Sequence, residues 1–182
     1  MNKNRLISAT VAPACLLALA GPLFRTTAAQ AIRLSAGLNG FQEVAPVLTT
    51  GSGEFTAMID PARTSLTFTL TYSDLLADAL QSHIHFGQRG VNGGVMVFFC
   101  TNITPPPAGV PQPQACPVRG GTVTGTITAA DVVGPTGQGI NPGNLDNVIS
   151  AILSGHTYVN VHSTRWPGGE IRGQAKAHSA DN

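Results

Sequence analysis

The sequence lacks the motifs that define several common classes of enzyme. No G-x-S-x-G elbow, phosphate-binding loop or dinucleotide-binding glycine motif occurs, and the few carboxylates are scattered. Ser163 directly follows His162, but neighbouring residues of a strand point to opposite faces, so this histidine is badly placed to activate the serine. The missing catalytic constellation favours a non-enzymatic protein and makes a hydrolase the least supported class.

Basic residues are scarce once the N-terminal segment is set aside. Residues 1–31 have the pattern of a signal peptide: a basic start, an apolar stretch over residues 6–24 and a small-x-small cleavage site at residues 29–31. Without Lys3, Arg5 and Arg25, the ten basic residues fall to seven, against nine acidic ones. This balance argues against nucleic acid as a partner, because its binding needs a clustered basic surface.

Long apolar runs are also missing after the leader. No later stretch approaches the roughly 18 apolar residues of a membrane span, so we expect no membrane span in the mature chain. The length suits one domain over residues 32–178, followed by a polar tail at residues 179–182. The predicted signal peptide places this domain outside the cytoplasm, in the periplasm or the extracellular space.

Only two cysteines, Cys100 and Cys116, follow the leader. Export to an oxidising compartment predicts a disulfide between them. The segment that they enclose, residues 101–115, is rich in proline and is incompatible with a helix or a central strand. A metal–thiolate site is less consistent with the sequence, because it needs more nearby ligands than two cysteines at this separation.

Apolar and polar residues alternate repeatedly in segments separated by turn residues. Leu66, Phe68, Leu70 and Tyr72 alternate with serine and threonine, which is typical of a strand with one buried face. The pattern predicts an all-β domain, an antiparallel sandwich or barrel of about eight strands. The expected strands are residues 32–38, 53–59, 64–72, 81–86, 95–100, 122–128, 157–162 and 170–177.

One segment has helical periodicity instead. Apolar residues recur at i, i+3, i+4 and i+7 within residues 144–153, Asn144 suits the N-cap position, and Gly155 follows the end. We expect one short connector helix whose apolar side covers an open end of the sheet core.

Two parts of the chain share an arrangement in which a histidine-bearing strand leads into a glycine-rich loop. The histidines are His85 and His162, and the glycine pairs that follow them are Gly93 and Gly94, and Gly168 and Gly169. Such glycines predict positive φ or a close backbone approach. A duplicated strand-loop-strand unit would bring the two histidine strands together.

The histidine strands contain candidate metal ligands. His83 and His85 are two residues apart, so both imidazoles point to the same face of a strand, and Asn160 and His162 share a face for the same reason. If the two strands are neighbours, His83, His85 and His162 form a three-imidazole site suited to copper or zinc, with one open position.

The same residues have a second interpretation that involves no metal. A histidine at a strand end can form hydrogen bonds with loop carbonyls and amides that would otherwise lack partners. In the metal interpretation, Glu170 or Asp74 supplies a carboxylate, as a ligand or as an acceptor for a ring N–H. Arg165 and Trp166 lie in the second loop, where the tryptophan either forms a binding patch or caps the barrel end.

Three ordered motifs, at residues 38–44, 82–95 and 158–174, resemble the CHRD family, a domain first described in chordin and found in many bacterial exported proteins. The resemblance covers residues 34–175 and implies an immunoglobulin-like or barrel-like β-fold. A more remote similarity is to Cu/Zn superoxide dismutases, which also place H-x-H on a strand of a β-sandwich. The residues that match the family motifs and could carry a function are His83, His85, Asn160, His162, Glu170 and Arg172.

Two hypotheses about function follow. The first is an exported, non-enzymatic β-domain that acts as a binding or envelope-associated module for an unidentified protein or envelope ligand. The second is a copper- or zinc-binding metalloprotein for metal storage or redox defence, with His83, His85 and His162 as ligands. Imidazole nitrogens that converge on one point favour the second hypothesis, whereas rings that point into separate loops favour the first.

Overall fold

Antiparallel strands make up most of the described chain. The computed structural model describes residues 30–178, so the expected polar tail and all but the last two residues of the expected signal peptide lie outside it. The strands are β1 (Ile32–Asn39), β2 (Ser52–Ile59), β3 (Leu66–Ser73), β4 (Ala79–Phe86), β5 (Gly94–Thr101), β6 (Gly121–Ile127), β7 (Thr157–Ser163), β8 (Ile171–Gln174) and β9 (Lys176–His178).

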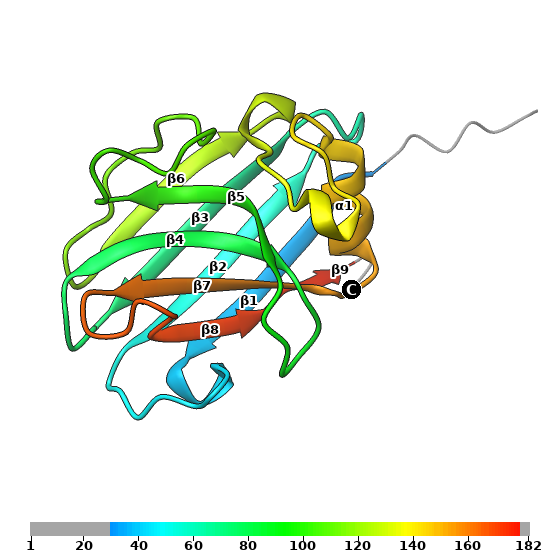
Figure 1. Cartoon of the computed structure of the whole chain (residues 1–182). Coiled ribbons are helices and arrows are strands. Elements are labelled where there is room, and N and C mark those ends of the chain that lie inside the picture. Colours follow the sequence, from blue (N-terminus) through cyan, green and yellow to red (C-terminus); the bar gives the residue numbers. More distant parts are fainter. Residues whose placement is uncertain (1–29, 179–182) are drawn as a thin grey trace, which may run out of the picture.

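One sheet with the order β5-β4-β7-β8-β1-β2-β3-β6 curls until its two edge strands approach each other, and β9 pairs with β1 off this path (Figure 1). All neighbouring strands are antiparallel. The result is a nearly closed barrel, which confirms the predicted all-β, antiparallel fold of about eight strands.

The barrel interior is filled by the inward-facing half of each strand. In β3, Leu66, Phe68, Leu70 and Tyr72 are buried, while the threonines between them are exposed or half-buried. Because side chains alternate across a strand, this two-residue period places every apolar residue of β3 on the core side. The predicted alternation is therefore confirmed.

The expected helix is α1 (Leu145–Leu153), and Figure 1 shows it at one end of the barrel. The Asn144 side chain accepts a hydrogen bond from the backbone N–H of Asn147 and so caps its first turn. Val148, Ile149 and Ile152 are buried in the same core cluster as the strands, so the helix covers an open end as expected. No helix within residues 30–178 has the length and apolar character needed to cross a membrane.

The strand expected at residues 170–177 divides into β8 and β9. Both keep one register against β1, because Asn39 lies opposite Arg172 and Ser35 opposite Lys176. Between them the backbone N–H of Ala175 donates to Thr157 on β7 instead. This bond continues the register of β8 with β7, and the sequence pattern gives no signal for the division into two strands, since the side-chain alternation does not change.

The segment between Cys100 and Cys116 spans the seam of the barrel. The two cysteines form the predicted disulfide, with Cα atoms 5.0 Å apart. Within the segment, the Gln114 side chain donates hydrogen bonds to Phe99 O on β5 and to Thr124 O on β6, at 3.5 and 2.8 Å. The tethered segment thus joins the two edge strands that do not pair directly.

We expect the double variant Cys100→Ser/Cys116→Ser to lose about 3 kcal/mol of unfolding free energy, because the unfolded chain regains the entropy of a loop of this length. Urea titration of the oxidised wild type and the variant measures the difference. Reduced wild type serves as the control and should match the variant. Equal denaturation midpoints for all three samples would contradict a stabilising role for the bridge.

Candidate metal site

The two histidine-bearing strands, β4 and β7, are direct neighbours. In their antiparallel register His83 lies opposite Asn160, and His85 lies opposite Tyr158. His162 is opposite Gln81, two positions further along the same face. The expected adjacency of the two strands is thus present, and it places all three histidines on one face of the sheet.

That face is the outer wall of the barrel. Ile84 and Val159 point the opposite way and belong to the barrel core, with exposures of 2 % and 0 %. The histidines are nevertheless buried, with exposures of 2 % for His83, 7 % for His85 and 6 % for His162. Loops folded over the wall therefore shield them from solvent.

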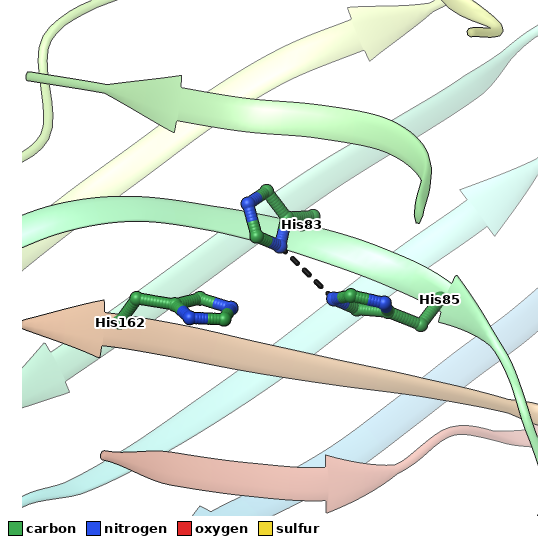
Figure 2. Close-up of side chains that lie close together, drawn as sticks. All are labelled: His83, His85 and His162. Carbon is green, nitrogen blue, oxygen red and sulfur yellow. Dashed lines mark hydrogen bonds between the residues drawn. The ribbon is translucent and has the colours of Figure 1, made fainter. Parts of the chain in front are cut away.

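The three imidazoles converge. Each ring has a nitrogen that lies within 4.8 Å of a nitrogen of the other two. Figure 2 shows the rings of His83 and His85 meeting from one strand while the ring of His162 points toward them from the next. His83 Nδ1 and His85 Nε2 are 3.0 Å apart. The structure therefore brings together the three ligand candidates that the sequence singled out.

Hydrogen bonds to the covering loops fix the tautomers of two of the rings. His85 Nδ1 donates to Gly93 O at 2.9 Å, and His162 Nδ1 donates to Pro167 O at 2.7 Å. A carbonyl only accepts, so Nδ1 must carry the proton in both rings and Nε2 must carry a lone pair. These are the expected hydrogen bonds to loop carbonyls, and they put the lone pair of each ring on Nε2, which faces the cluster.

The remaining ring nitrogens are poorly satisfied. His162 Nε2 is buried and has no hydrogen-bond partner among the described residues. His83 Nε2 is likewise buried without a partner among these residues. His85 Nε2 accepts a hydrogen bond from His83 Nδ1 at 3.0 Å and also lies 3.1 Å from Asn160 Oδ1. Since Nε2 and Oδ1 both carry lone pairs, this pair becomes favourable when a cation lies between them or when the amide turns its NH₂ group to the ring. The cluster thus presents lone pairs that protein donors do not fully satisfy.

Burial keeps the cluster neutral. Desolvation lowers the pKa of His83 well below its ordinary value, and the neighbouring His162 and His85 rings lower it further. Burial also lowers the pKa of His85 to about 4 and the pKa of His162 below its ordinary value. At neutral pH all three rings therefore have lone pairs available, as metal coordination requires.

An aromatic and cationic stack supports the cluster from one side. The ring of Tyr158 lies parallel to that of His85, with centroids 4.6 Å apart, and the Arg172 guanidinium lies 3.3 Å from the Tyr158 ring centroid. Arg172 also donates to the backbone carbonyls of Gln88 and Val91. This buried arginine thus holds the loop between β4 and β5 over the histidines.

The glycine pairs contribute through close contacts. At Gly93 a Cβ would lie 1.7 Å from Phe86 O, and at Gly169, where φ is +130°, it would lie 2.3 Å from Glu43 Oε1. At Gly94 it would meet the Pro135 ring, whereas Gly168 has neither positive φ nor a neighbour within 4 Å. The expectation for the glycine pairs is therefore wrong for Gly168 alone.

Two carboxylates considered from the sequence lie outside the cluster. Glu170 is fully buried, but it accepts hydrogen bonds from Thr49 Oγ1 and the Leu76 backbone N–H, at 2.6 and 2.8 Å. Asp74 accepts from its neighbour Ser73. Glu170 thus ties together the loops at one end of the barrel and does not face the three histidines.

Arg165 and Trp166 lie in the loop between β7 and β8. The Arg165 guanidinium is 4.6 Å from the centroid of the Trp166 ring. Arg165 is exposed and Trp166 is half-buried, so this pair forms part of the surface beside His162.

One residue near the cluster was missed as a functional candidate. Glu43 belongs to the first family motif, and it follows the short 3-10 helix η1 (Gly40–Gln42) with only 5 % exposure. Burial raises its pKa to about 7, although the nearby side chains of Arg172 and Asn160 act in the opposite direction. Its presence in the motif was the available signal, but nothing in residues 38–44 indicates contact with a strand more than a hundred positions away.

Fold and site together define a β-barrel domain whose outer wall carries a buried three-histidine cluster. The family model of the CHRD domain matches residues 34–175, which is most of the chain, so the protein belongs to the CHRD domain family. Neither a curated protein nor a solved structure matches the chain significantly.

The buried histidines predict acid destabilisation of the metal-free protein. Histidine titrates near pH 6.5 in an unfolded chain, and the pKa of His85 in the folded protein is about 4. Between these values the unfolded state binds more protons, so stability falls as pH falls, by up to about 1.4 kcal/mol per pH unit for each such histidine. Urea unfolding from pH 7 to pH 4 tests this, and His85→Gln should show a shallower decline.

Glu43 acts in the opposite direction over part of this range. Its pKa is about 7 in the folded protein and 4.5 in its ordinary state, so the folded state binds the extra proton and gains stability as pH falls between these values. The histidine effect is therefore cleanest in a Glu43→Gln background. Stability that stays constant or rises between pH 6.5 and pH 4.5 in that background would contradict it.

Proposed function

We propose that this CHRD domain binds a copper or zinc ion through His83, His85 and His162. The observation that carries the proposal is that each of three imidazoles with lowered pKa values presents a nitrogen within 4.8 Å of the other two. Metal–nitrogen bonds of about 2.0–2.1 Å place two ligand nitrogens no more than about 4.2 Å apart, so coordination needs only a small contraction.

The chemistry of the ligands supports copper or zinc. Neutral imidazole suits both metals, and a three-histidine set leaves a further coordination position open. The loop carbonyls of Gly93 and Pro167 support the proposed ligands from outside the coordination sphere. Each carbonyl accepts a hydrogen bond from the Nδ1–H of His85 or His162 and so fixes the orientation of that ring. Burial of all three rings supports metal storage over catalysis. A catalytic metal would need a substrate to reach its open coordination position, and burial hinders this access.

We further propose that the domain works outside the cytoplasm, in the periplasm or the extracellular space. The disulfide between Cys100 and Cys116 supports this location, because such bonds persist in oxidising compartments. The basic and apolar pattern of residues 1–31 supports it independently.

A binding module that needs no metal is the second candidate function. The loop between β1 and β2 exposes two large apolar side chains, Phe41 at 70 % and Leu48 at 82 %. Together with Arg165 and Trp166, they favour a role in binding another protein or an envelope component.

Metal content decides between the two. Protein purified without chelators and without a polyhistidine tag should carry up to one copper or zinc ion per chain, measured by mass spectrometry of the elements. After reconstitution, the triple variant His83→Ala/His85→Ala/His162→Ala should bind more weakly by more than about 100-fold, the upper range for losing one outer-shell partner.

His156 and His178 provide the matched control. Both are exposed and neither belongs to the cluster, so His156→Ala/His178→Ala should retain the bound metal. Metal lost in this variant and kept in the triple variant would indicate adventitious surface binding. Wild-type protein that carries no metal above background after reconstitution would refute the metal proposal and favour the binding module.

A further inference from the structure

Glu43 is a buried carboxylate beside the histidine cluster. Its side chain occupies space left by Gly169, where a Cβ would lie 2.3 to 2.8 Å from both carboxylate oxygens and Cδ. Within residues 30–178, Glu43 Oε1 is buried without a hydrogen-bond partner. A carboxylate held in this way is costly to ionise unless positive charge lies nearby.

Asn160 links this carboxylate to the cluster. Its side chain lies 3.1 Å from His85 Nε2 and close enough to Glu43 to lower the pKa of that carboxyl. Asn160 is opposite His83 on β4 and opposite Arg172 on β8, so it stands at the centre of the outer wall. Glu43 and His85 therefore have Asn160 as a common neighbour.

Arg172 does not neutralise Glu43 by direct contact. The guanidinium is occupied by Asn92 Oδ1 and by the carbonyls of Gln88 and Val91, and it forms no ion pair with Glu43 within the described chain. Three neutral imidazoles add no negative charge. A divalent ion at the cluster would therefore place two positive charges near a buried arginine, with Glu43 as the nearby carboxylate to balance them.

We propose that Glu43 is the charge-compensating positioning residue of the three-histidine site and makes it selective for a divalent over a monovalent metal ion. This inference rests on the proposed metal-binding function. The Coulomb attraction between the carboxylate and the ion is proportional to the charge of the ion, so Glu43 stabilises Zn²⁺ or Cu²⁺ about twice as strongly as a monovalent ion. Glu43 also favours the orientation of the Asn160 amide in which Oδ1, and not the NH₂ group, faces the cluster, so that the lone pair of His85 Nε2 is not blocked by an amide donor.

The test compares Zn²⁺ with Ag⁺, a monovalent ion that imidazole binds without a reductant, by competition titration of the full mature protein. Glu43→Gln should weaken Zn²⁺ binding by about 10- to 100-fold, the range for an outer-shell partner. It should weaken Ag⁺ binding only by about the square root of that factor, about 3- to 10-fold, because the Coulomb energy halves with the charge. The Zn²⁺/Ag⁺ affinity ratio should therefore fall.

Three further variants keep the test decisive. Glu54→Gln removes an exposed carboxylate from β2 and should change neither affinity. Glu43→Asp retains the charge and should restore most of the Zn²⁺/Ag⁺ ratio. If Glu43→Gln fails to fold, Glu43→Ala removes the same charge and should lower the ratio in the same way.

The possible failures are distinguishable. Wild-type protein that binds neither ion would refute the proposed metal function and this inference together. Wild-type protein that binds both ions, with a Zn²⁺/Ag⁺ ratio unchanged by Glu43→Gln, would overturn the role of Glu43 alone and leave the three-histidine site intact.

Discussion

The antiparallel pairing of β4 with β7 is the constraint on which the site depends. Side chains alternate across a sheet, so a slip of one residue in either strand would turn its histidines into the barrel and its valines or isoleucine out to the loops. Ile84, Val159 and Val161 prevent this slip, because their burial in the core stabilises one register only. The apolar face of these two strands thus places His83, His85 and His162 together, and the metal-binding potential of the outer wall is a consequence of packing on the inner one.

The hydrogen bonds that shield the cluster also prepare it for coordination. If His85 and His162 have only a structural role, each ring should donate a hydrogen bond to a carbonyl of the loop that covers it. Both rings do so through Nδ1. That contact leaves the lone pair of each ring on Nε2. The structural and metal-binding interpretations of the glycine-rich loops are therefore compatible, because the contact that orders a loop also fixes the tautomer that a metal ligand requires.

Much of this arrangement follows from periodicity, and the rest depends on contacts that leave no periodic signal. The H-x-H spacing puts His83 and His85 on one face of a strand. The similar unit around His162 predicts that its strand lies beside theirs. Glu170 looks equally suited to the site from its motif, yet its carboxylate accepts hydrogen bonds from Thr49 and Leu76, which belong to loops far from it in the sequence. Glu43 lies in a loop, where side-chain direction follows no two-residue rule, and only the space over Gly169 brings it near Asn160. Positions on regular strands could thus be predicted, whereas positions set by loops could not.

Charge is what most limits the chemistry of such a site. A cation bound on the outer wall of this barrel would lose its hydration shell. Neutral imidazoles replace the coordinating water molecules, but they supply no negative charge to balance the charge of the ion. Arg172 makes the balance worse, yet it cannot be dispensed with, because it pins the loop between β4 and β5 that excludes solvent. Burial orders the ligands, and Arg172 maintains this burial. Both make a bound cation less stable unless a negative charge lies nearby. Of the buried carboxylates in residues 30–178, Glu170 is held at the barrel end, so Glu43 is the one in a position to supply it.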